Sequence, residues 1–223
     1  MNTAKRTALA LVLAVFALTW VAPRWPLEQA LHSSLTVGGL LWLWRHDRRW
    51  TMRSVDFAAI CAFIAVHCIA ARWLYSNVPY DRWLVELTGW SPQAAFGWER
   101  NHFDRLIHFL YGLLFMPALH DDAQRRWPIR PHQAFAIALA LILISGLVYE
   151  WLEWGIALAL SPEAAEAYNG QQGDMWDAHM DMLLAAFGAV LTWPWLRRRG
   201  RGAGGHAGGR ASAGAGMHTG TGT

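Results

Sequence analysis

Six long apolar runs, separated by polar or basic segments, make up most of the chain. Most of these runs approach or exceed the roughly 20 residues that an α-helix needs to cross a bilayer. The runs cover residues 7–22, 27–44, 55–75, 103–119, 132–160 and 175–195. This pattern predicts an all-α fold, a polytopic transmembrane helical bundle of about six helices.

The basic residues concentrate in alternate polar segments, which predicts how the bundle is oriented. Lysine and arginine near transmembrane helices favour the cytoplasmic side. The basic segments are the N-terminus with Lys5 and Arg6, residues 45–53, residues 121–131 and the arginines after residue 196. All four fall on one side of a six-helix arrangement, so we expect both the N and the C terminus in the cytoplasm.

Changes in composition along the chain divide it into three predicted parts. Residues 1–75 would form about three N-terminal transmembrane helices, and residues 76–196 a core membrane domain. Within the core, the connection before the fourth run would hold a short interfacial helix around Arg82–Thr88, whose tryptophan suits the headgroup level. Residues 197–223 are rich in glycine and have nothing to bury, which predicts a disordered cytoplasmic tail.

The overall composition supports lipid as the solvent of this chain. Hydrophobic residues make up 54% of the 223 residues and charged residues only 16%, with 15 tryptophans suited to the membrane interfaces. The net charge of +3 comes from the loops and chain ends, so it indicates topology and no nucleic-acid partner. We therefore expect the lipid bilayer as the main partner, while the pattern favours no particular oligomeric state.

Three aspartates enter the last apolar run on one predicted helix face. At about 100° per residue, Asp174, Asp177 and Asp181 fall within an arc of roughly 60°. The fourth run begins with Asp104, and His108 follows one turn later. In the predicted topology both groups lie at the outer ends of their helices, so we expect them to meet.

The fifth run adds two glutamates at the same predicted depth. Glu150 and Glu153 lie near its end, which is also the outer boundary when the helix is counted from the cytoplasm. Charged groups within a bilayer cost at least about 2.5 kcal/mol each and normally face a cavity or a partner. Helices four to six should therefore deliver their acids to one outward-facing site.

Such a concentration of carboxylates requires counter-charge, which a divalent metal would supply. Carboxylate oxygens with imidazole nitrogen suit Mn, Fe or Zn better than Ca. Glu153 and His179 would then serve as the spare acid or base. The predicted metal ligands are Asp104, His108, Glu150, Asp174, Asp177 and Asp181.

Simpler roles compete with metal binding at several of these positions. Asp174, Asp177 and Asp104 suit the first turn or the cap of a helix, where an acid interacts favourably with the helix dipole. Glu150 is also suited to polar contacts between helices, and Glu153 to a hydrated surface. Capping does not explain Asp181 or His108, because both lie inside their predicted helices.

Three blocks of residues resemble the signature of the YjdF-like bacterial inner-membrane proteins. The blocks are Asp104–Phe109 with Tyr111-Gly112, Tyr149–Trp154, and Gln172–Asp177 with Asp181-Met182. The resemblance implies a multi-pass protein of the bacterial inner (plasma) membrane, in a family without an assigned activity. The first block is more loosely similar to VanZ-like membrane proteins, which carry an Asp-Lys-x-x-His-Phe pattern where this chain has Arg105.

Three classes of function fit the predicted site. The first is a divalent-metal-dependent hydrolase or transferase that acts on a lipid-linked or phosphorylated substrate. The second is ion- or proton-coupled transport that uses the same carboxylates as a relay. The third is a structural or assembly protein in which these side chains only fasten the helices together.

Overall fold

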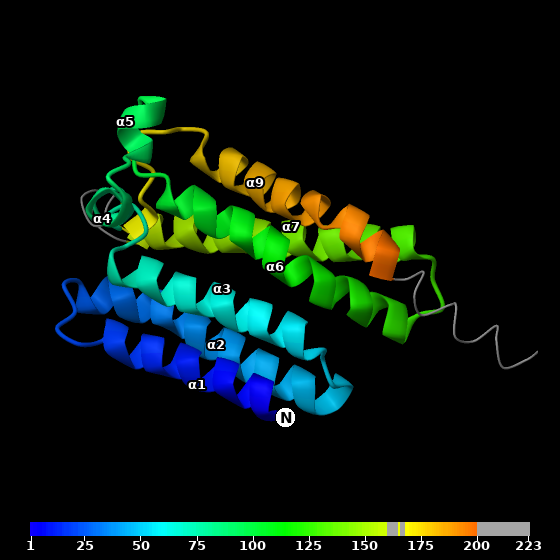
Figure 1. Ribbon diagram of the computed structural model, residues 1–223. Coiled ribbons are helices and arrows are strands. Elements are labelled where there is room, and N and C mark those ends of the chain that lie inside the picture. The colour runs from blue at the N-terminus through cyan, green and yellow to red at the C-terminus, as the bar shows by residue number, and fades with distance from the viewer. Residues whose placement is uncertain (160–164, 166–167, 200–223) are drawn as a thin grey trace, which may run out of the picture.

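Long helices that run up and down beside one another make up this protein, as seen in a computed structural model that describes residues 1–159, 165 and 168–199 (Figure 1). No strand occurs among these residues, so the all-α prediction is confirmed. The helices are α1 (Thr3–Thr19), α2 (Pro26–Trp50), α3 (Ser54–Arg72), α4 (Tyr80–Thr88), α5 (Pro92–Phe96), α6 (Phe103–Arg126), α7 (Pro131–Ala159) and α9 (Asp177–Leu191).

Local sequence signals account for several helix ends. The Asn2 side chain accepts a hydrogen bond from a backbone N–H in the first turn of α1, and Ser91 does the same for α5. Proline opens α2 at Pro26, where no backbone hydrogen bond is lost. Gly89 and Gly97 end the two short helices in the left-handed region, which glycine adopts without strain. The short helix predicted around Arg82–Thr88 is present as α4.

Two helices extend beyond the apolar runs that predicted them, which corrects the predicted loops 45–53 and 121–131. The helix α2 continues to Trp50 and α6 to Arg126. Arginines in the last turn of a helix interact favourably with its dipole, and an i,i+4 pair between Arg126 and Asp122 supports the end of α6. A helix therefore need not end where its apolar surface ends.

The long helices form two groups of three that meet along α3 and α6. The helix α3 packs against α1, α2 and α6, while α6, α7 and α9 pack against one another. Aromatic rings fill the junction, including Phe63 of α3, whose ring centroid lies 5.2 Å from that of Phe115 in α6. Among the described helices, α3 and α7 are the two that are long and apolar enough to cross a membrane by length and composition.

The basic segments lie together at one end of the bundle, where the N-terminus is found (Figure 1). Lys5 is buried there, 2.6 Å from Asp47, and it also donates to the carbonyl oxygen of Met52. Arg125 at the end of α6 donates to the carbonyl oxygen of Trp50. These bonds join α1, α2 and α6, and the helices α4 and α5 lie at the opposite end.

Arg199 adds the C-terminal segment to the same end and corrects part of the predicted tail. Residues 193–199 are helical, and Arg199 forms a two-pronged pair with Asp56 at 3.0–3.1 Å. It also lies 3.7 Å from Asp121. The predicted disordered tail therefore does not begin at residue 197, because buried acids fix this arginine. The remainder of that tail, residues 200–223, lies outside the described residues.

Glycines let α6 and α9 approach until their backbones touch. A Cβ atom added to Gly112 would collide with the backbone of Ala185, and one added to Gly188 would collide with the carbonyl oxygen of Phe109. On the adjoining face, a Cβ at Gly146 of α7 would lie 2.9 Å from Met182 Sδ of α9. Small residues at such crossings are typical of membrane helices that pack closely.

We expect Gly188→Ala to destabilise the protein by about 1–3 kcal/mol or more. The new methyl group would collide with backbone atoms of α6, which, unlike a side chain, cannot move aside by changing rotamer. The measurement is the thermal unfolding midpoint in detergent. Gly155→Ala is the matched control, since a Cβ at Gly155 in α7 meets no atom of the described residues within 4 Å. A Gly188→Ala variant as stable as Gly155→Ala would contradict the close α6–α9 contact.

Candidate functional site

The predicted metal ligands gather at the end of the bundle opposite the N-terminus. Asp104 and His108 lie one turn apart on α6, and Asp177 and Asp181 lie one turn apart on α9. The i,i+4 spacing places each pair on a single helix face. Both faces are turned toward each other because the glycine contact between α6 and α9 begins one turn further along each helix.

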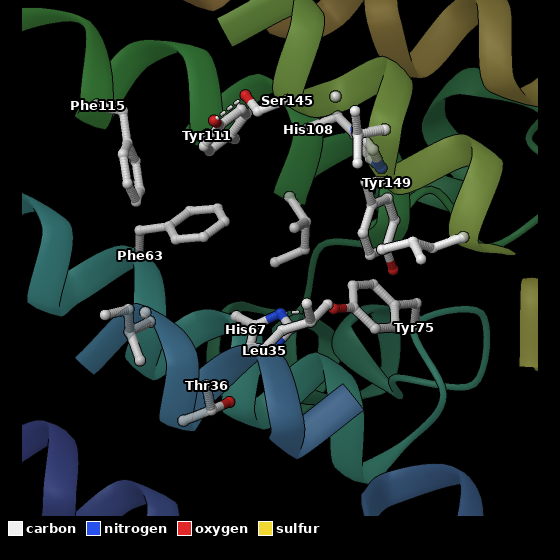
Figure 2. A pocket seen from close by; sticks show the side chains of 16 residues that line it. Leu35, Thr36, Phe63, His67, Tyr75, His108, Tyr111, Phe115, Ser145 and Tyr149 are labelled. Carbon is white, nitrogen blue, oxygen red and sulfur yellow. Dashed lines mark hydrogen bonds between the residues drawn. The ribbon is translucent and has the colours of Figure 1, made fainter. Parts of the chain in front are cut away.

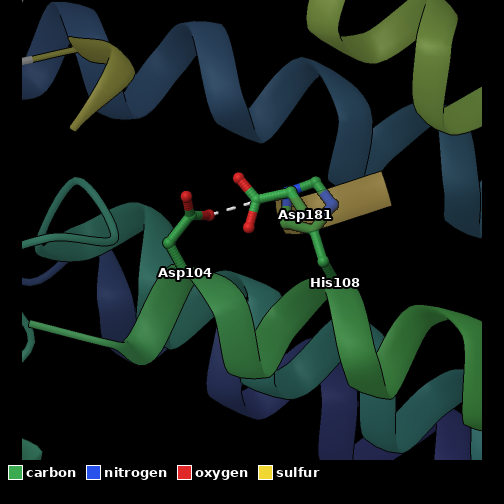
Figure 3. A group of neighbouring side chains, drawn as sticks. All are labelled: Asp104, His108 and Asp181. Carbon is green, nitrogen blue, oxygen red and sulfur yellow. Dashed lines mark ion pairs between the residues drawn. The ribbon is translucent and has the colours of Figure 1, made fainter. Parts of the chain in front are cut away.

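Asp104, His108 and Asp181 form the centre of this group (Figure 3). The ligand atoms that they offer all lie within 4.8 Å of one another, and each residue is at most 7% exposed. His108 Nε2 lies 3.7 Å from Asp104 Oδ1 and 3.9 Å from Glu150 Oε1 on α7. Three helices thus contribute to one buried centre, which we call the acidic cluster: Asp104, His108, Glu150 and Asp181.

Two oxygens of the acidic cluster lack hydrogen-bond partners. Asp181 Oδ1 and Glu150 Oε1 are buried, and neither accepts a hydrogen bond from any residue in the described part of the chain. A buried carboxylate without a donor or a cation is costly, so such groups normally have one. The cluster therefore has the ligand types, spacing and unmet acceptors of a cation site, and equally of a site that shares protons.

Arginines form ion pairs with Asp174 and Asp177, the two predicted metal ligands that lie outside the acidic cluster. Arg100 Nη1 lies 3.1 Å from Asp174 Oδ2, and Arg100 Nη2 lies 2.7 Å from Asp177 Oδ1. Arg105 Nη2 contacts the same oxygens at 2.5 and 3.8 Å. Asp174 and Asp177 are therefore paired with arginines, whereas among the described residues no arginine or lysine forms an ion pair with the acidic cluster. Sequence reasoning gave no role to Arg100, although an arginine in an outer segment poor in basic residues was a usable signal.

These arginines also affect the ionisation of two groups that lie just before the helices α6 and α9. The pKa of Asp174, in the turn before α9, is lowered by a hydrogen bond from the backbone N–H of Trp176 and by the charges of Arg105 and Arg100. The pKa of His102, which precedes α6, is lowered by burial and by the same two arginines. At neutral pH Asp174 is consequently an anion and His102 is neutral.

The two predicted acid–base residues lie in different surroundings. Glu153 is half-buried on α7, close enough to Asp104 and Glu150 to interact electrostatically with their charges. His179 is exposed and packs edge-on against Trp176, with ring centroids 5.3 Å apart. A residue two positions from Asp177 and two from Asp181 points about 200° away from them on a helix, so His179 does not face the cluster.

A cavity of about 320 Å³ adjoins the acidic cluster between α2, α3, α6 and α7 (Figure 2). His108 belongs to both, because it also lines this cavity. Tyr149, the residue before Glu150, lines it as well. The buried polar centre is thus connected to an apolar space inside the bundle.

This fold and site define a helical membrane protein with a buried carboxylate–histidine cluster at one end. Residues 4–202 match the family described as "Predicted membrane protein (DUF2238)", and the chain belongs to this family. The chain is also similar to the inner membrane protein YjdF of Escherichia coli (strain K12), with 29% identity over 153 residues, 68% of each chain. No solved structure matches the chain.

These findings confirm the YjdF-like resemblance, the lipid bilayer as the environment of the chain, and its location in the bacterial inner membrane. They assign no activity. The chemistry of the site must therefore be argued from its own residues.

We expect Asp174→Asn to lower the thermal unfolding midpoint at pH 7 by a few degrees, because the variant removes one of the two carboxylates that pair with Arg100 and Arg105 and leaves them only Asp177. The folded pKa of Asp174 lies below its ordinary value, so its stabilising effect is present at neutral pH and is lost as the pH falls through the folded pKa. Unfolding midpoints measured from pH 7 toward pH 3 should therefore converge for wild type and variant.

The control is Glu86→Gln, which breaks an exposed i,i+4 pair with Arg82 on α4 and should change the midpoint little. A difference between wild type and Asp174→Asn that persists unchanged to low pH would contradict the role given to the charge.

Proposed function

We propose that this protein is a divalent-metal-dependent hydrolase or transferase that acts on a lipid-linked or phosphorylated substrate. The observation that carries the proposal is the geometry of Asp104, His108 and Asp181. Their ligand atoms lie within 4.8 Å of one another, and one oxygen of Asp181 is buried without a partner in the described residues. Two carboxylates and an imidazole are a donor set that favours Mn, Fe or Zn.

The charge balance at the two ends of the bundle supports a bound cation. At the basic end, the buried acids Asp47 and Asp56 are paired with Lys5 and Arg199. In and around the acidic cluster, the described residues include six carboxyl groups and two guanidinium groups. The carboxyl groups are those of Asp104, Glu150, Glu153, Asp174, Asp177 and Asp181, and the guanidinium groups those of Arg100 and Arg105.

In this proposal each residue has a distinct role. Asp104, His108 and Asp181 hold the metal, and Glu150, 3.9 Å from His108 Nε2, completes the ligand set or accepts a proton from water. A bound divalent cation would lower the pKa of water and neutralise phosphoryl oxygens. Arg100 and Arg105 offer bidentate donors of the kind that bind phosphate, while Asp174 and Asp177 keep them in position.

The proposal also includes the orientation of the bundle. We place six helices across the membrane with both termini in the cytoplasm and the acidic cluster on the outer side. The support is that the basic segments share one end of the bundle, as the positive-inside rule requires of cytoplasmic segments, and that the acidic cluster lies at the other.

Proton-coupled transport is the second candidate, because a polar chain leads from the cavity into the first three helices. The Tyr75 hydroxyl and His67 Nδ1 are hydrogen-bonded at 2.5 Å, and His67 Nε2 lies 3.3 Å from the carbonyl oxygen of His32. Protons can pass along such chains. Against transport, the buried acids Asp47 and Asp56 at the basic end are held in ion pairs.

We expect the purified wild-type protein to contain close to one equivalent of Mn, Fe or Zn, and Asp181→Asn to lower that content at least about tenfold. The measurement is elemental analysis after purification in detergent, with and without incubation in each metal. His179→Gln is the matched control, since this exposed histidine lies on the same helix and faces away from the cluster.

Equal metal content in wild type and Asp181→Asn would refute the metal site. A wild type that binds none of the three metals would do the same. An unchanged unfolding midpoint in Asp181→Asn would then favour a proton relay over contacts that merely fasten the helices.

We expect a cysteine introduced by Ala95→Cys in α5 to react with a membrane-impermeant maleimide in intact cells lacking the outer membrane. A cysteine from His132→Cys, at the start of α7, should react only after lysis. Ala95 and His132 are both exposed, so a cysteine at either position is accessible to the reagent. The native Cys61 and Cys68, which are buried, are replaced by alanine so that the introduced cysteine is the one that is labelled. The reverse labelling pattern would invert the proposed orientation.

A further inference from the structure

The cavity beside the acidic cluster has the size and surface of a binding site for an apolar molecule. Its volume of about 320 Å³ lies near the lower end of the range for small-molecule sites, roughly 300–1,000 Å³. Apolar side chains from four helices form most of its wall, among them Leu35, Phe63, Phe115 and Leu152 (Figure 2). The cavity is thus suited to hydrocarbon.

Most polar groups in the wall bind one another and leave little to hold water. The hydroxyl groups of Tyr111 and Ser145 lie 2.6 Å apart, and the Tyr75 hydroxyl is bonded to His67. The Tyr149 hydroxyl is buried as well, beside Tyr75 and Glu153. Because water needs several polar partners, an apolar space of this kind excludes it.

The cavity opens toward lipid between α2 and α7. Leu35 of α2 and Val148 and Leu152 of α7 line it, yet their exposed fractions are 39%, 45% and 51%. These residues therefore form a rim at the surface of the bundle. In a chain that belongs to a membrane protein family, a rim on a long apolar helix such as α7 faces the acyl chains of the bilayer.

The inner end of the cavity connects this opening with the acidic cluster. His108 lines the cavity and belongs to the cluster. Tyr111 and Phe115 line it further along α6, which places Phe115 about 10 Å from His108 along the helix axis. A molecule lying along this path would have its polar end at the cluster and its apolar end deep in the bundle.

We infer that the cavity binds one hydrocarbon chain of a membrane lipid, which enters between α2 and α7 and places the polar head of that lipid at the acidic cluster. The chemistry at the head rests on the proposed function, whereas the binding of the chain rests on the cavity alone. The inference makes the lipid-linked substrate class specific: a lipid bound laterally from the bilayer by its chain.

Two adjacent glycines of α2 provide a variant and a matched control. Gly39 lines the cavity, and the nearest atom to a Cβ built there is Ile64 Cδ1, at 3.8 Å, so the backbone at this position accepts a side chain. We expect the leucine of Gly39→Leu to occupy part of the cavity. Gly38 is exposed, does not line the cavity, and a Cβ there meets nothing within 4 Å. Leucine also favours a helix over glycine at both positions.

The experiment is photo-crosslinking in vesicles of phosphatidylethanolamine and phosphatidylglycerol that contain a trace of phosphatidylglycerol with a diazirine in its acyl chain. Crosslinked residues are mapped by mass spectrometry. We expect wild type and Gly38→Leu to be labelled in the cavity wall at Phe63 and Phe115, and Gly39→Leu to show at least about fivefold less labelling there. Labelling of exposed residues on α9, such as Val190, serves as the reference in all three.

Labelling of the cavity wall that is equal in Gly39→Leu and wild type would overturn the inference, as would labelling confined to the outer surface. Leu152→Trp at the exposed rim is a second variant that does not depend on repacking inside the bundle, and it should also reduce labelling. Asp181→Asn is included so that the two proposals can fail separately. Labelling that persists when this variant has lost its metal, or when no metal is bound at all, still supports the lipid chain.

Discussion

The site depends on the backbone contact between α6 and α9. Gly112 and Gly188 allow the two helices to touch where any larger side chain would collide with the backbone of Ala185 or Phe109. One turn from this contact lie His108 and Asp181, so the close approach of the helices also sets the distance between these two side chains. Burial of the cluster is therefore a consequence of helix packing, which fixes its geometry before any ligand binds.

The buried carboxylates at the two ends of the bundle differ in how completely they are paired with cations. Near the N-terminus, Lys5 and Arg199 neutralise Asp47 and Asp56, and these pairs join helices that are distant in the sequence. Around the acidic cluster at the other end, carboxyl groups outnumber guanidinium groups, and one Asp181 oxygen has no hydrogen-bond partner in the described part of the chain. A buried ion pair that is complete serves the fold, whereas incomplete pairing is what functional sites typically retain. Because the same chain pairs its other buried acids completely, the incomplete pairing in the acidic cluster marks it as the candidate functional site.

Much of the fold was predictable from the apolar runs, because helices in a membrane satisfy their backbone hydrogen bonds internally and so must be long and apolar. That constraint predicted the all-α class, and the alternation of basic segments predicted which helix ends lie together. It did not predict where α2 and α6 end, since an arginine-rich turn such as that at Arg125 and Arg126 remains helical when it meets a helix dipole and local carboxylates. Nor did it predict the helical segment at Arg199, which depends on the distant residue Asp56.

For the site, the sequence by itself determined which residues share a helix face, because helical spacing is a local property. It placed Asp104 with His108 and Asp177 with Asp181. The same spacing turns His179 away from the latter pair, which the prediction of His179 as an acid or base did not take into account. Only the tertiary structure decided that Asp174 and Asp177 are held by Arg100 while Asp181 is not, and that α2 and α3 close a cavity against His108. Those relations depend on how far neighbouring helices approach and rotate, which the packing of side chains across the whole bundle fixes.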